Sequence, residues 1–127
     1  MIGYVTLGTN DLARGAKFYD ALAAELGTPR MMEEPTFIAW GTPDGAAGIG
    51  LTKPHDGQPA TVGNGVMVAL QASSREQVQR LYDIALANGG SCEGPPGPRG
   101  GPFYAGYFRD PDGNKLNAFL MEAGSGA

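Results

Sequence analysis

Few side chains in this sequence combine the type and the setting that catalysis requires. The only histidine, His55, lies in a polar loop, and a base there would still need a partner and a substrate within hydrogen-bond reach. This setting favours a solvated histidine. Glu33 and Glu34 end a short predicted strand, where they are either a base at the rim of a cavity or, as the pattern favours, an exposed charge pair. The only cysteine, Cys92, has no cation or histidine beside it in the sequence, which is typical of a buried, inert thiol.

Other residues are candidates for binding a ligand. Arg99 lies within residues 94–102, whose prolines and glycines predict an irregular loop. It would meet an anionic ligand if that loop closed, and a solvated arginine is the alternative. Trp40 could stack on a ligand or fill the core. The same two roles are open to three other aromatic residues, Phe37, Tyr104 and Tyr107. The sequence contains no nucleophile elbow, phosphate-binding loop or nucleotide fingerprint.

An internal repeat determines how these residues are positioned. Two pairs of segments correspond at an offset of 63, namely Phe18-Tyr19-Asp20 with Leu81-Tyr82-Asp83 and Val5-Thr6-Leu7 with Val68-Ala69-Leu70. Two turns correspond at an offset of 68, namely Thr42-Pro43-Asp44-Gly45 and Asp110-Pro111-Asp112-Gly113. The change of offset locates an insertion, most simply at residues 94–102. The repeat predicts one domain, residues 1–127, made of two units at about residues 1–56 and 62–122.

Each unit reads as a strand, a helix and three further strands. The strands are expected at residues 2–8, 30–33, 37–40, 48–53, 65–71, 91–93, 103–109 and 115–121. The apolar stripe of the first helix comprises Leu12, Ala16, Tyr19, Leu22, Ala23 and Leu26, and that of the second Val78, Leu81, Tyr82, Ala85 and Leu86. The first helix is expected to begin after Thr9-Asn10-Asp11 and to stop at Gly27. The second is expected to begin after Ser73-Ser74 and to stop at residues 88–90. Residues 123–127 are expected to fray. The pattern predicts an α+β fold.

Alternation along the strands gives each strand two faces. One face is aliphatic and is expected to pack against the helices: Val5, Leu7, Ile49, Leu51, Val68, Leu70, Leu116, Ala118 and Leu120. The other face has almost no charge: Tyr4, Thr6, Gly48, Gly50, Thr52, Met67, Ala69, Gln71, Asn117, Phe119 and Met121. A face of this kind is either the wall of a cavity or an interface.

Three parts of the chain carry a family resemblance: Tyr4-Val5-Thr6-Leu7 with Asn10-Asp11-Leu12 and Phe18-Tyr19, then Gly65-Val66-Met67-Val68-Ala69-Leu70, and Phe108-Arg109-Asp110-Pro111-Asp112-Gly113-Asn114-Lys115-Leu116. Together they resemble the vicinal oxygen chelate superfamily of glyoxalase I, bleomycin-resistance proteins, fosfomycin-resistance enzymes and extradiol dioxygenases. The resemblance covers essentially the whole chain. It implies two tandem βαβββ modules that form a half-open mixed β-sheet barrel with the helices outside.

The resemblance also implies where a metal would be held. Enzymes of this superfamily bind a divalent cation on the concave sheet face through His, Gln and Glu side chains. The corresponding positions here are Tyr4, Gly50, Met67 and Asn117. Glycine offers no donor atom, a thioether is soft, and a phenol or an amide alone is a weak ligand. We therefore expect no metal and no other cofactor. The catalytic base of glyoxalase I is among the lost ligands, so no catalytic residue is assigned.

These considerations predict a metal-free protein that sequesters or carries a small molecule in a pocket on the concave face, as bleomycin-resistance proteins do. The expected lining is Tyr4, Trp40, Gly50, Met67, Arg99, Asn117, Phe119 and Met121. One alternative is a glyoxalase-like lyase of the lactoylglutathione lyase type, or a dioxygenase, with an unconventional metal site or base. Another is an interaction module whose mixed face is simply a dimer interface.

Composition limits the partners and the compartment. A net charge of −4 argues against nucleic acid and anionic membrane surfaces as partners, and it is compatible with a cationic ligand. No apolar run reaches membrane-spanning length, and a lone cysteine fits a reducing compartment, so we expect a cytoplasmic protein. A homodimer is expected, because half-open sheets leave strand edges and apolar surface to cover.

Overall fold

The computed structural model describes residues 1–122 and contains eight strands and two helices in two successive βαβββ units. The first unit comprises β1 (Tyr4–Gly8), α1 (Leu12–Leu26), β2 (Arg30–Glu34), β3 (Phe37–Trp40) and β4 (Gly48–Thr52). The second comprises β5 (Val68–Gln71), α2 (Arg75–Ala87), β6 (Ser91–Pro98), β7 (Phe103–Arg109) and β8 (Lys115–Met121). The expected frayed tail, residues 123–127, lies outside the described residues.

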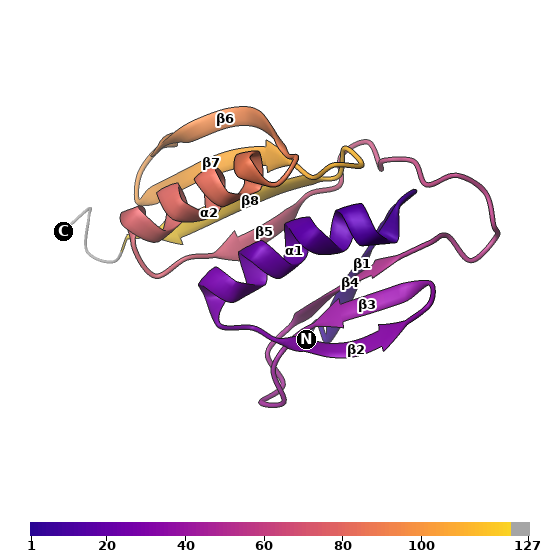
Figure 1. Ribbon diagram of the computed structural model, residues 1–127. Coiled ribbons are helices and arrows are strands. Elements are labelled where there is room, and N and C mark those ends of the chain that lie inside the picture. The colour runs from indigo at the N-terminus through magenta and orange to yellow at the C-terminus, as the bar shows by residue number, and fades with distance from the viewer. Residues whose placement is uncertain (123–127) are drawn as a thin grey trace.

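Each unit forms its own four-stranded mixed sheet, and the two sheets do not close into one barrel (Figure 1). The strand orders are β1-β4-β3-β2 in the first sheet and β5-β8-β7-β6 in the second. In both sheets the first strand runs parallel to the last strand of its unit. The same arrangement therefore occurs twice, which confirms the α+β fold of two tandem modules.

The register of the sheets confirms the two predicted faces. Val5 lies opposite Ile49, and Leu7 lies opposite Leu51, across β1 and β4. The corresponding pairs across β5 and β8 are Val68 with Leu116 and Leu70 with Ala118. Residues directly opposite in a sheet share a face, so the aliphatic residues of each sheet lie together.

The helices cover the aliphatic faces and create one core. Helix α1 packs on β3, β4 and α2, whereas α2 packs on β6, β7 and β8 (Figure 1). Helix α1 begins at the N-cap Asp11, whose carboxylate accepts from the Arg14 N–H, and ends at Gly27 in a left-handed conformation with φ of 68°. Both predicted helix ends are confirmed. The largest fully buried side chains of the core are Phe18, Phe108, Leu22, Leu51, Leu81 and Leu116.

The prediction that residues 94–102 are irregular is wrong in part, because β6 continues to Pro98. This strand tolerates Pro95, Pro96 and Pro98 because it lies at the edge of its sheet, where an outward-facing N–H is not needed for pairing. Register shifts after Cys92 and Gly94 accommodate the extra residues as bulges. The predicted insertion therefore lies largely within a strand.

The two units are joined by polar contacts between the second turn and the start of α1. Asp112 accepts from the Thr9 hydroxyl at 2.6 Å, from the Asn10 backbone N–H at 2.9 Å and from the Arg14 guanidinium at 2.9 Å. The Asn114 amide donates to the Gly8 carbonyl at 2.9 Å. We call this set of contacts the inter-unit latch. It fixes α1 relative to the second sheet.

Candidate functional site

The sheet faces opposite the helices, here called the open faces, carry the residues expected to form a site. In the first sheet the open face is identified by the register pairs Thr6 with Gly50, Ala39 with Gly50 and Ala39 with Met32. In the second sheet Asn117 lies opposite both Ala69 and Tyr107, and Phe119 lies opposite Gln71 and Ala105. The face assignment made from alternation is therefore confirmed for these strands.

Large apolar side chains on or beside these open faces are exposed. Tyr4 retains 66% of its surface exposed, Met121 56%, Met32 49% and Met67, which precedes β5, 41%. Flexible thioethers and an aromatic ring of this kind adapt to varied ligands or partners. The open faces thus present an apolar surface that the single chain leaves in contact with solvent.

The four positions implied for a metal do not form a suitable donor set. Gly50 is covered by the ring of Phe37, since a Cβ at residue 50 would lie 2.7 Å from the Phe37 Cζ atom. Tyr4 is largely exposed, whereas Asn117 is 1% exposed and its Oδ1 atom has no hydrogen-bond partner among residues 1–122. No three His, Cys, Asp or Glu residues within 1–122 are grouped so as to hold a metal ion. The residues present do not fit a divalent cation.

We expected Trp40 to line a pocket on the concave face of the sheet, but its side chain lies on the face that the helices cover. The side chain is 4% exposed, and its register partner Ile49 belongs to the helix-covered face. Its indole N–H donates to Asp20 at 2.8 Å, and its ring packs 5.5 Å from that of Tyr19. Alternation along β3 puts Trp40 on the same side as Ile38, so this tryptophan is a core residue and does not line the open face.

A cavity of about 690 Å³ lies beneath α1, between the strand edges of β1 and β5. Trp40 and Met67 both line this cavity, together with Tyr19 and Gln71. Its lining does not include Gly50, Arg99, Asn117, Phe119 or Met121. The expected site residues are therefore divided between this cavity and the open faces.

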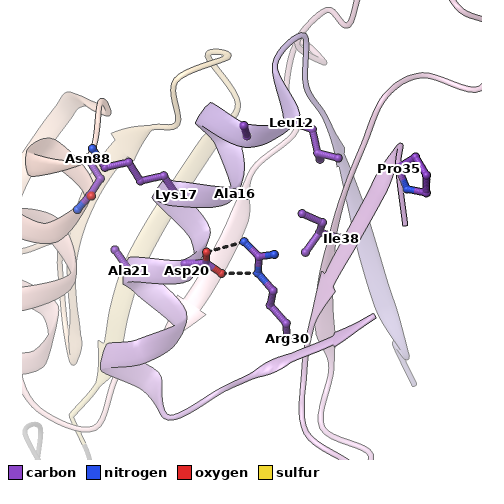
Figure 2. Close-up of a pocket in the computed structure, with 10 residues that line it drawn as sticks. Leu12, Ala16, Lys17, Asp20, Ala21, Arg30, Pro35, Ile38 and Asn88 are labelled. Carbon is purple, nitrogen blue, oxygen red and sulfur yellow. Dashed lines mark hydrogen bonds and ion pairs between the residues drawn. The ribbon is translucent and has the colours of Figure 1, made fainter. Parts of the chain in front are cut away.

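A second hollow of about 810 Å³ lies on the outside of the molecule, against α1 and the start of β2 (Figure 2). The Arg30 guanidinium forms two hydrogen bonds with the Asp20 carboxylate, at 2.8 and 2.6 Å, and contacts Glu33 as well. These bonds lower the pKa of Asp20 below its usual range. Because Arg30 is already satisfied by two carboxylates, it offers little to an anionic ligand. Glu33 and Glu34 are both exposed, as the sequence favoured, and Glu33 pairs with Arg30.

Arg99 is exposed and folds back along β6, where its guanidinium donates to the carbonyls of Pro95 and Pro98. The guanidinium carbon lies 5.4 Å from the centre of the Tyr107 ring, and the Lys115 ammonium lies 5.6 Å from the same centre. We did not predict a role for Lys115. Side chains alternate along a strand, so the alternation that places Asn117 on the open face also places Lys115 there. The position of Lys115 could therefore have been predicted from the sequence.

Among residues 1–122, neither His55 nor Cys92 forms a side-chain hydrogen bond to a residue of the cavities or the open faces. His55 is exposed, as favoured for a solvated loop histidine. Cys92 is exposed rather than buried. The expectation that Cys92 is buried was wrong because β6 is an edge strand. A side chain near its start therefore has only one neighbouring strand to pack beside.

The architecture and the open faces define a class of α+β proteins built from two βαβββ units. The chain belongs to the Glyoxalase/Bleomycin resistance protein/Dioxygenase superfamily, whose family model matches residues 1–118.

Solved structures agree with this assignment. A glyoxalase/bleomycin resistance protein from Albidiferax ferrireducens T118 is 42% identical, with a TM-score of 0.87 over 94% of this chain and 98% of that chain. A glyoxalase/bleomycin resistance protein/dioxygenase family enzyme from Burkholderia phytofirmans PsJN is 19% identical, with a TM-score of 0.75 over 94% and 97% of the two chains. A lactoylglutathione lyase from Agrobacterium tumefaciens is 19% identical, with a TM-score of 0.69 over 94% and 92%. The latter two show the fold alone. A comparison with curated proteins finds no match.

Proposed function

We propose that this protein binds a small, partly aromatic molecule without a metal, and that it sequesters or carries this molecule on the open faces of its sheets. The observation that carries the proposal is the exposed apolar surface formed by Tyr4, Met32, Met67 and Met121 on or beside these faces. Exposed apolar side chains gathered on one side of a protein mark a site for a ligand or a partner.

The chemistry of the implied metal positions supports the metal-free part of the proposal. The Phe37 ring fills the space in which a side chain at residue 50 would begin. Neither the exposed Tyr4 phenol nor the Met67 thioether supplies the carboxylate or imidazole that zinc, nickel or iron requires. These residues do offer apolar and polarisable contact area, which suits a planar organic ligand.

The proposal includes a homodimer. Neither of the two cavities described above is centred on the open faces. A second copy that covers these faces would enclose a pocket between the sheets, and it would remove the exposed methionines from water. Pairing and ligand binding thus use the same surface.

The test combines native mass spectrometry of protein purified without chelator with fluorescence titration of 2-naphthol, a neutral aromatic probe. We expect the mass of two chains without stoichiometric metal, and saturable binding of 2-naphthol. Phe119→Ala, on the open face, should weaken that binding about fivefold, because loss of an aromatic contact costs about 1 kcal/mol.

Leu86→Ala is the matched control, since Leu86 is an exposed apolar residue of α2, away from the open faces. It should leave binding unchanged. Stoichiometric zinc, nickel or iron bound through residues 4, 50, 67 and 117 would contradict the proposal. Equal effects of the two substitutions on 2-naphthol binding would also contradict it.

A further inference from the structure

The open face of the second sheet carries two cations without acidic partners. The Arg99 guanidinium and the Lys115 ammonium lie 5.4 and 5.6 Å from the centre of the Tyr107 ring. Within residues 1–122, neither Arg99 nor Lys115 forms an ion pair, since no carboxylate oxygen lies within 4.0 Å of either charged group. The net charge of −4 therefore does not describe this part of the surface.

The other arginines of the described chain are all paired with carboxylates. Arg14 contacts Asp112, and Arg30 contacts Asp20; the three remaining arginines, Arg75, Arg80 and Arg109, pair with Glu122, Glu25 and Glu93 respectively. Arg75 is the closest parallel to Arg99, since it too lies over a tyrosine ring, that of Tyr104 at 4.5 Å. Unlike Arg99, it is neutralised by a carboxylate. Arg99 thus departs from the pattern of the rest of the chain.

Two glycines make room for the Arg99 guanidinium on this face. A Cβ at Gly94 would lie 3.4 Å from the Arg99 Nη2 atom and 3.5 Å from the Tyr107 ring. A Cβ at Gly97 would lie 3.0 Å from the Nη1 atom. The register places Gly94 opposite Tyr107 and Gly97 opposite Ala105, on the open face. The guanidinium is therefore held against β6 by the backbone rather than extended into solvent.

A buried acceptor lies in the same part of the sheet. Asn117 is opposite Tyr107 across β7 and β8, is 1% exposed, and its Oδ1 atom has no partner within residues 1–122. Leaving a buried acceptor unpaired is unfavourable, so such an atom in a folded protein calls for an explanation. A ligand that donates a hydrogen bond would remove this cost.

We propose that Arg99, Lys115, Tyr107 and Asn117 form a subsite for an aromatic carboxylate that also carries a hydroxyl or N–H donor. The carboxylate would be attracted by both cations, which flank Tyr107 from the β8 and β6 sides, the ring would lie beside Tyr107, and the donor would point towards Asn117 Oδ1. This inference rests on the proposed function and specifies its ligand class. It differs from the cationic ligand with which the overall charge is compatible.

The test uses three probes of similar size: 6-hydroxy-2-naphthoate has both groups, 2-naphthoate lacks the hydroxyl, and 2-naphthol lacks the carboxylate. Binding to the full chain is measured by fluorescence titration at low ionic strength. We expect 6-hydroxy-2-naphthoate to bind about tenfold more tightly than either other probe, because each of the others lacks one of the two groups that the subsite would hydrogen-bond.

Three substitutions assign the groups. Arg99→Met and Lys115→Met, which keep an apolar stem, should each weaken binding of both carboxylates about fivefold while leaving 2-naphthol within twofold. Asn117→Leu should abolish the preference for 6-hydroxy-2-naphthoate over 2-naphthoate. Arg75→Met is the matched control, because it removes a cation from above a tyrosine on the helix-covered face, and it should leave all three affinities unchanged.

The outcomes separate this inference from the proposed function. If 2-naphthol binds but the carboxylates bind no more tightly, or if Arg99→Met and Lys115→Met both leave carboxylate binding unchanged, the subsite is wrong while the binding function stands. If none of the three probes binds, both proposals fail. Selective loss of carboxylate binding in either cation variant supports the subsite, and the two variants test it independently if one of them folds poorly.

Discussion

Tyr19 is a residue whose ionisation is strongly affected by the fold. Its side chain lies in the core, with the ring edge-on to Phe18, and its hydroxyl donates to the Asp110 carboxylate at 2.7 Å. Burial, followed by the charge of Asp110, raises the pKa of Tyr19 well above its usual value. The phenol must therefore stay protonated for the core and the second turn to stay joined.

This environment predicts a loss of stability in alkali. Because the folded pKa is raised above the unfolded value of about 10, the stabilisation is complete below pH 10 and is lost as the pH rises towards the folded pKa. Tyr19→Phe should lower the free energy of unfolding at pH 7 by about 1–2 kcal/mol, since Asp110 loses one donor. It should also flatten the decline above pH 10.

Urea unfolding between pH 7 and 11 measures both effects, with Tyr4→Phe as the control because Tyr4 is exposed and its hydroxyl makes no hydrogen bond within residues 1–122. The same alkaline decline in Tyr19→Phe as in the wild type would contradict the assignment.

At the scale of elements, the two corresponding turns have acquired different roles. Asp112 of the second turn has a buried carboxylate that takes part in the inter-unit latch. Its counterpart in the first turn, Asp44, bonds only to Thr42 and to the Ala46 N–H and is exposed. The second turn therefore connects the two units, whereas the carboxylate of the first turn bonds only within its own turn, among the described residues.

We expect Asp112→Asn to lower the free energy of unfolding by about 2–4 kcal/mol, because it weakens a buried network that includes an ion pair with Arg14. Asp44→Asn is the matched control, and it should change stability by no more than about 0.5 kcal/mol. Chemical denaturation of both variants decides between these roles. Equal losses would show that the latch does not hold the units together.

The elements were largely predictable from the sequence because their signals are local. Stripes of period 3.6, the alternation along strands and residues such as Asp11 and Gly27 depend on near neighbours in the chain. The extension of β6 was missed because proline is excluded from paired strands but tolerated at an edge, and edge position is a property of the finished sheet.

The site was less predictable, for a related reason. Alternation placed Tyr4, Gly50 and Asn117 on the open faces, but the covering of Gly50 by Phe37 depends on contact across two strands. Trp40 was assigned to the wrong side because residue type, not register, guided its choice. The pairing of Arg99 with Tyr107 joins residues across an edge with two register shifts, which no periodicity reveals.

At the scale of the whole molecule, the open faces give the chain an apolar surface that its own helices do not cover. Within residues 1–122, no helix is long and apolar enough to span a membrane. Methionines from both units, Met32 and Met121, lie on these faces and are exposed. A second copy of the chain is the occupant that we propose.

Sedimentation velocity tests this proposal directly. We expect the wild type to sediment as a dimer at micromolar concentration. Met32→Glu and Met121→Glu should each shift the population to monomer, because a charge placed in an apolar interface loses its hydration. Leu86→Glu, on exposed α2, should remain dimeric. A monomeric wild type, or equal dissociation of the Leu86 variant, would contradict the proposal.

The latch has a further consequence for the history of the duplicated chain. If two separate half-length copies had once paired with full twofold symmetry, each turn would have held the helix start of the other copy. Within residues 1–122 one such joint is present, from Asp112 to Thr9 and Asn10. Its mirror image would join Asp44 to the beginning of α2, and that contact is absent from the described residues. The two halves of the chain therefore repeat each other in sequence and fold but depart from twofold symmetry in the contacts of their turns.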